Sequence, residues 1–197
     1  MRNRIKFAVF TSLMWLISAN LMASSFVVDR ASSQVKWKGK KVTGEHYGQI
    51  RIQSGTVEVN GNAIAAAAVE MDMNSIAVED LKDDGMNAKL VGHLKSDDFF
   101  SVEKFPSSRL VLTGVKALGN NEAELTGNLT IKGITHPVKF GVKTVIEGNT
   151  LKSSGVITVN RAKYDIRYGS GSFFTGLGDK MIYDDFTLDF SLVANKK

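Results

Sequence analysis

The sequence predicts an all-β fold: a single eight-stranded antiparallel β-barrel of the lipocalin-like kind, with one short helix closing one end. Three observations predict it. Apolar and polar residues alternate along most of the chain from residue 24 onward, Gly and Asn turn signals separate the alternating stretches, and one stretch repeats its apolar residues every four positions. Alternation with one apolar face is typical of antiparallel strands that bury one side and solvate the other.

The first 23 residues are predicted to be a secretory signal peptide. Arg2, Arg4 and Lys6 precede a short apolar run over residues 7–17, and small residues surround a cleavage site near Ala23. A membrane-spanning helix needs about 20 apolar residues, and this run is shorter. We therefore expect residues 1–23 to be removed, and the mature domain, residues 24–197, to be periplasmic.

The composition narrows the classes of function. The chain has no cysteine, which excludes disulfides, thiolate metal sites and a lipid anchor on a thiol. Its 25 basic and 20 acidic residues give a net charge of +5, but without Arg2, Arg4 and Lys6 the mature part keeps 22 basic residues and a charge of +2. This weak charge argues against a nucleic-acid partner. The mature chain contains two prolines and no linker-like stretch, and we expect one domain.

The alternating stretches define the strands in order. Gly and Asn at residues 61–62, 119–121 and 148–149 predict tight hairpins between them, because both residues accept a positive φ. The alternating apolar positions are Val35 and Trp37; Ile50 and Ile52; Val57 and Val59; Val69, Met71 and Met73; Leu110 and Leu112; Leu125, Leu129 and Ile131; Val138, Phe140 and Val142; Ile157 and Val159; and Phe186, Leu188, Phe190 and Leu192.

One segment has the helical period instead. Met86, Leu90 and Leu94 recur every four residues, behind Asp83 and Asp84. Carboxylates at a helix start accept hydrogen bonds from the free backbone N–H groups, so this pattern predicts a short amphipathic helix. Its apolar stripe needs a surface to cover, and the nearest is an open end of the barrel.

The inward positions of the barrel decide what it holds. An eight-stranded barrel is wide enough to be filled by its own side chains or to hold one elongated ligand. The inward positions are aliphatic and aromatic, so we expect an apolar ligand. The candidate lining residues along the strands are Trp37, Val69, Met71, Leu110, Leu112, Leu129, Phe140, Ile157, Phe186 and Phe190, with Leu90 and Phe99 at the end that the helix closes.

Several segments together resemble the YceI-like family of lipid-binding, lipocalin-like periplasmic proteins. They are the run from His93 to Pro106, the hairpin LTIKGITHPV at residues 129–138, Asn160-Arg161, and the closing alternation over residues 186–193. The resemblance covers essentially all of the mature chain. It implies an extended barrel whose hydrophobic bore accepts a polyisoprenoid, an isoprenoid quinone or a fatty amide, and which binds or transports this lipid without catalysis and without a cofactor.

The chain departs from the family pattern near its start. Many members carry His-Ser where this sequence has Ser32-Ser33, and a second frequent histidine corresponds to Lys41. A histidine contact with the polar head of a ligand therefore does not transfer to this chain. Arg161 remains a candidate ligand contact with two interpretations: it either meets an anionic head group at the mouth of the bore or pairs with a carboxylate of the protein.

Two other classes of function stay open. One is a stress-related enzyme or metal-dependent hydrolase that uses His46, His93 and a carboxylate such as Asp97, although the three histidines of the chain lack the spacing of metal ligands. The other is a structural or interaction barrel with a filled bore. The Gly- and aromatic-rich segment between Tyr168 and Tyr183 is a candidate lid or edge, suited to a homodimer or to transient membrane contact.

Overall fold

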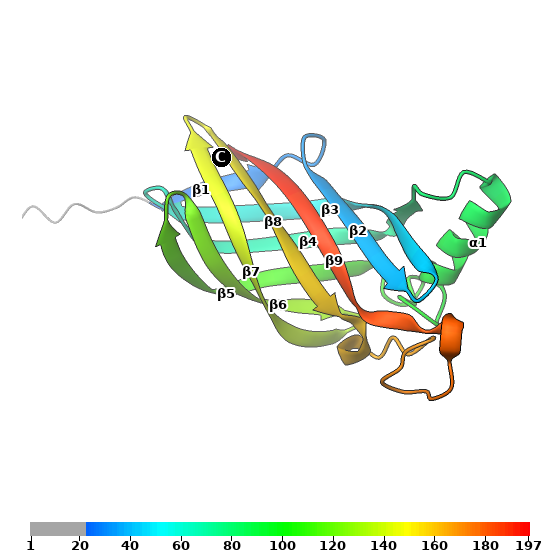
Figure 1. The fold of residues 1–197 in the computed structure, drawn as a ribbon. Coiled ribbons are helices and arrows are strands. Elements are labelled where there is room, and N and C mark those ends of the chain that lie inside the picture. Colours follow the sequence, from blue (N-terminus) through cyan, green and yellow to red (C-terminus); the bar gives the residue numbers. More distant parts are fainter. Residues whose placement is uncertain (1–22) are drawn as a thin grey trace, which may run out of the picture.

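The computed structural model describes residues 23–197, which form a closed antiparallel β-barrel (Figure 1). The predicted signal peptide lies outside the described residues except for Ala23. No helix among residues 23–197 has the length and apolar character needed to cross a membrane. The strands are β1 (Ala23–Val28), β2 (Gln34–Lys41), β3 (Gly44–Asn60), β4 (Ala63–Val78), β5 (Ser107–Gly119), β6 (Glu122–Ile131), β7 (Ile134–Glu147), β8 (Thr150–Asn160) and β9 (Ile182–Lys196).

The barrel has eight positions, as predicted, although it is built from nine strand segments. Its order is β3-β2-β9-β8-β7-β6-β5-β4, and pairing between β3 and β4 closes the ring. β1 pairs with the same two neighbours as β2, namely β3 and β9, so β1 and β2 together occupy one position. The break between them is stabilised by Asp29, whose carboxylate accepts hydrogen bonds from the Ala31 N–H (2.9 Å) and the Ser32 hydroxyl (2.8 Å).

The three predicted hairpin turns are observed. Gly61, Gly119 and Gly148 adopt φ values of 59°, 89° and 60°, and Asn120 adopts 52°. These are left-handed conformations that most residues with a Cβ avoid. A fourth hairpin, between β6 and β7, turns at Lys132 and Gly133, also with positive φ. Short turns of this kind keep consecutive strands adjacent and produce the meander.

The predicted helix is α1 (Asp84–Lys95), and it lies beyond one end of the barrel (Figure 1). The Asp83 carboxylate caps it by accepting from the Met86 N–H at 2.8 Å. Leu94 is buried, and Leu90 is partly buried against the core. Met86 was expected on the apolar stripe, but its side chain is 60% exposed because the first turn of the helix extends past the barrel wall.

A second segment covers the same end of the barrel as α1. It begins at the 3-10 helix η1 (Arg161–Tyr164), passes through residues 165–177 and the 3-10 helix η2 (Gly178–Lys180), and joins β9. We call residues 165–181 the lid; Figure 1 shows it, brown to orange, below α1. The lid attaches to the sheet through an isolated bridge between Ser170 and Ile182 and a hydrogen bond from the Val42 N–H to the Met181 carbonyl.

One close approach between strands depends on a glycine. A Cβ at Gly48 of β3 would lie 1.9 Å from the Ala77 carbonyl oxygen of β4, which is impossible without backbone movement. On the other side of β3, Trp37 pairs with Gly48 and donates its indole N–H to the same Ala77 oxygen at 3.0 Å. The absence of a side chain at Gly48 therefore allows Trp37 to reach across β3 and fixes its ring at the cavity wall.

Candidate ligand-binding cavity

An apolar cavity of about 220 Å³ runs along the inside of the barrel. On β8 its lining extends from Leu151 to Ile157, which is about 20 Å along a strand that rises about 3.3 Å per residue. The lining side chains come from every strand from β2 to β9 and from both segments that cover the α1 end. The cavity is therefore long and narrow, with room for a slender chain rather than a bulky ligand.

All the predicted site residues except Leu90 line this cavity. Leu90 packs against the core from the helix, but Leu94, one turn further on, provides the helical contribution to the lining. Contact of these residues with a ligand stays a prediction. The predicted residues that line the cavity are Trp37, Val69, Met71, Phe99, Leu110, Leu112, Leu129, Phe140, Ile157, Arg161, Phe186 and Phe190.

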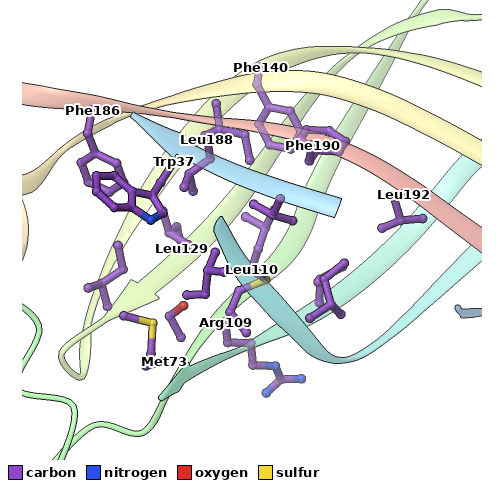
Figure 2. A pocket seen from close by; sticks show the side chains of 18 of the residues that line it. Trp37, Met73, Arg109, Leu110, Leu129, Phe140, Phe186, Leu188, Phe190 and Leu192 are labelled. Atoms are coloured by element: carbon purple, nitrogen blue, oxygen red, sulfur yellow. The ribbon is translucent and has the colours of Figure 1, made fainter. Parts of the chain in front are cut away.

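Aromatic rings give the cavity wall its shape. Phe140 and Phe190 meet edge to face with their centroids 6.1 Å apart. The Phe190 ring packs over Gly155, where an added Cβ would come within 3.1 Å of the ring. In Figure 2 the rings form two groups along the cavity, Trp37 with Phe186 and Phe140 with Phe190. Edge-to-face pairs of this kind add to the energy of burial and hold the rings in place, so the wall is preformed.

The site prediction missed further lining residues of two kinds. The first kind lies on the strands, on the same face as the predicted lining residues. These residues are among the alternating apolar positions of the sequence, and a prediction that used all of those positions would have included them: Val35, Ile50, Ile52, Val57, Met73, Leu125, Ile131, Val142, Leu188 and Leu192. The second kind includes Ile166 of the lid and Ile182 where the lid joins β9. The composition of the segment between Tyr168 and Tyr183 predicts a candidate lid or edge, but the segment has no apolar period that would show which of its residues face the bore. Ile166 lies before that segment.

The cavity ends at a cluster of side chains from α1 and its following loop. Leu94, Phe99 and Phe100 line it there, and Phe100 meets Phe186 edge to face at 6.3 Å. Phe99 also packs against His93, with the two ring centroids 4.9 Å apart. The helix and its loop thus cover the barrel end with apolar side chains, as the sequence predicts.

Arg161 lies in η1, just before the lid, and is a structural residue that holds the lid in place. It is 4% exposed, and its guanidinium donates to four backbone carbonyls, those of Ile166 (3.1 Å), Tyr168 (2.8 Å), Ile182 (3.0 Å) and Tyr183 (3.2 Å). Its Nη2 also lies 3.4 Å from an Asp184 carboxylate oxygen. Of the two interpretations of Arg161, the structure favours the pairing with a carboxylate of the protein.

The electrostatics of Arg161 agree with this role. Burial lowers the pKa of Arg161, while the charge of Asp184 raises it and offsets part of the cost. A guanidinium has five N–H donors, and four carbonyls and one carboxylate surround this one. Arg161 lines the cavity, but its hydrogen-bonding capacity is used by the protein rather than left for an anionic head group.

The residues of the alternative enzyme site have separate partners. His46 hydrogen bonds to Asp80 at 2.7 Å, His93 to Asp98 at 3.1 Å, and Asp97 accepts from Lys104 at 2.7 Å. Burial alone would raise the pKa of Asp80, but the Tyr47 N–H and the His46 ring outweigh it and lower this pKa. In residues 23–197, no three His, Asp or Glu side chains come together as a metal site.

The sequence from residue 26 to residue 194 matches the family model of the YceI-like domain. The chain belongs to the YceI-like family. It is 28% identical over 130 residues to a UPF0312 protein of Azotobacter vinelandii, which is 64% of this chain and 65% of that protein. It is 36% identical over 85 residues to a UPF0312 protein of Shewanella denitrificans, or 43% of this chain and 42% of that protein. The YceI-like chain thus spans less than two thirds of the length of these curated relatives.

Solved structures share the fold of this YceI-like chain. The crystal structure of BcnA from Burkholderia cenocepacia has a TM-score of 0.68 at 24% identity, covering 85% of this chain and 99% of that one. A polyisoprenoid-binding domain from Saccharophagus degradans has a TM-score of 0.61 at 14% identity, covering 88% and 99%. A YceI protein of Campylobacter jejuni has a TM-score of 0.54 at 16% identity, covering 100% and 99%. These likenesses confirm the barrel fold.

Proposed function

We propose that this protein binds and transports a long-chain apolar lipid in the bore of its barrel, without catalysis. The observation that carries the proposal is the long apolar cavity inside a closed barrel. A polyisoprenoid, an isoprenoid quinone or a fatty amide has the slender apolar chain that this cavity accepts. Each buried methylene contributes about 0.8 kcal/mol, so a cavity of this kind shields a chain that water disfavours.

The family supports the proposal. The structural neighbour from Saccharophagus degradans is described as a polyisoprenoid-binding domain, and it has the same barrel. At 14% identity this neighbour supports the class of ligand only by analogy of fold. The apolar lining of the present cavity gives an independent reason for the same class.

The proposal also includes the compartment in which the protein works and the end of the barrel through which lipid enters and leaves. We place the mature protein in the periplasm, because the first 23 residues have the charged start and short apolar run of a signal peptide. We place lipid exchange at the α1 end, where the lid exposes Phe173 and Phe174, at 42% and 50% of their surface. These side chains suit transient contact with a membrane. The alternative role of this surface is to form a homodimer through the lid.

Lipid extracted from the purified protein tests the proposal. The protein is purified gently from its own secretory compartment and extracted with organic solvent, and the extract is analysed by mass spectrometry. We expect a stoichiometric long-chain lipid from the native protein. The variant Leu112→Trp plus Ile157→Trp should carry none, because both side chains line the cavity and two indoles would fill it.

A matched variant controls for the effect of two added tryptophans. Val111→Trp plus Val156→Trp places the same residues at the neighbouring positions, which point to the outside of the barrel, and this variant should keep the lipid. Empty extracts from a folded native protein and from this control would contradict lipid carriage and leave a barrel that works without a ligand.

A further inference from the structure

Ser108 brings a hydroxyl group to a cavity that is otherwise lined by apolar side chains. It lies near the start of β5, is 8% exposed, and faces the bore. Within residues 23–197, the Ser108 hydroxyl forms no hydrogen bond with a protein group, and it is not one of the fully enclosed polar atoms, so it is open to the cavity. A hydroxyl that is open to an apolar cavity is free to donate a hydrogen bond to a bound molecule or to accept one from it.

The other polar side chains of the lining are already engaged. Ser153 hydrogen bonds to Thr144 at 2.9 Å, and Arg161 is surrounded by four carbonyls and Asp184. Arg109 reaches the lining from the strand, but it is exposed, and Figure 2 shows its guanidinium directed away from the bore. Tyr183 also lines the cavity, but it is 48% exposed. Among the described lining residues that are buried, Ser108 is therefore the polar side chain left to contact a bound molecule.

The surroundings of Ser108 define what it can contact. It pairs with Met71 of β4 and has Leu110 two positions further along β5, and both line the cavity beside it. Methionine side chains are flexible and adapt to a bound chain, whereas they supply only weak hydrogen-bond acceptors. A ligand group that pairs with Ser108 is therefore surrounded by apolar atoms on its other sides.

We propose that the Ser108 hydroxyl hydrogen bonds to a single uncharged oxygen-bearing group of the lipid, a hydroxyl or a carbonyl, and so positions the chain along the bore. This inference rests on the proposed lipid binding and deepens it. A phosphate at the same depth would be a buried charge without a free cation, because Arg161 is engaged and Arg109 points outward. The cavity should therefore prefer neutral isoprenoid lipids to their phosphates.

A set of three probes of equal chain length tests the contact: a polyprenol, the corresponding polyprenyl phosphate, and the hydrocarbon without an oxygen. The chain has two tryptophans, Trp15 and Trp37, and cleavage near Ala23 leaves Trp37 at the cavity wall as the reporter of binding by fluorescence. The native protein should bind the polyprenol most tightly. Ser108→Ala should weaken polyprenol binding by about three- to tenfold and leave hydrocarbon binding unchanged, as expected for one neutral hydrogen bond.

Ser107→Ala is the matched control, because Ser107 is the adjacent residue and faces a depression on the outside of the barrel. It should change binding of none of the probes. Equal losses for polyprenol and hydrocarbon in Ser108→Ala would overturn the proposed contact, and so would equal affinities of the native protein for polyprenol and polyprenyl phosphate. A native protein that binds none of the three would instead contradict the proposed function itself.

Discussion

At the scale of the residue, Tyr164 is buried without a partner for its hydroxyl. It is 1% exposed, its ring meets His136 edge to face at 5.3 Å, and its oxygen accepts or donates no hydrogen bond within residues 23–197. Burial raises the pKa of Tyr164, so the group is neutral across the physiological range. The ring contributes packing, whereas the hydroxyl has lost its hydration without compensation.

We expect Tyr164→Phe to leave stability unchanged or to raise it by up to about 1 kcal/mol, because it removes an unpaired polar group and keeps the ring. Thermal or urea unfolding measures this change. Tyr183→Phe is the matched control, since Tyr183 is 48% exposed and its hydroxyl is free to bind water. A clear loss of stability in Tyr164→Phe would mean that the hydroxyl has a partner in solution.

At the scale of the element, Arg161 holds the lid to the start of β9. Its guanidinium donates to carbonyls near both ends of the lid, those of Ile166 and Tyr168 within its first residues and those of Ile182 and Tyr183 directly after it. Asp184 accepts from the Ser172 hydroxyl at 2.6 Å and pairs with Arg161, which adds a second connection between lid and strand. The two ends of the lid therefore depend on one side chain.

Arg161→Ala should release the lid. It leaves four carbonyls without their donor and Asp184 without its ion-pair partner, and removing one partner of a buried ion pair costs about 3 to 5 kcal/mol. We expect faster proteolysis within residues 165–181 and a lower melting temperature. Arg167→Ala, in the same lid, should change little, because Arg167 is 59% exposed and pairs with the exposed Asp165. Unchanged proteolysis in Arg161→Ala would show that other contacts hold the lid.

The elements that the sequence predicted are those specified by local pattern. The hairpins follow from Gly and Asn at three turns, and α1 follows from Asp83 and the spacing of Leu90 and Leu94. The strand residues that line the cavity follow from the alternation along each strand. A shift of the strand pairing by one residue would turn these apolar side chains to solvent. These features need only residues that are close in sequence.

The features that were not predicted depend on residues distant in sequence. The division of one barrel position between β1 and β2 depends on pairing with β3 and β9. The two interpretations of Arg161 were separated only when the lid placed four carbonyls and Asp184 around it. Leu90 has the same period as Leu94 and packs against the core, but only Leu94 lines the cavity, and the position of the helix on the barrel decides between them.

At the scale of the whole molecule, the lid places exposed aromatic residues at the end of the barrel where α1 and the lid cover the apolar cavity. Tyr183 lines the cavity, and Tyr168, Phe173 and Phe174 of the lid are each more than 40% exposed. Acidic and basic residues are mixed along the lid, with Arg167 stacked on Phe173 at 4.9 Å. Contact with a membrane at this end would then depend on aromatic side chains rather than on attraction to anionic lipids.

Phe173→Ser plus Phe174→Ser should reduce binding to vesicles of zwitterionic lipid, measured by co-sedimentation, and added salt should have little effect on the native protein because screening acts on charges. Leu118→Ser is the matched control: Leu118 is 57% exposed, but it lies on the β5–β6 hairpin at the other end of the barrel. Equal vesicle binding by the double variant and the native protein would contradict membrane contact through the lid. If the double substitution instead converts a dimer to a monomer in sedimentation velocity, the lid is the contact between two copies of this chain, and lipid exchange must use another route.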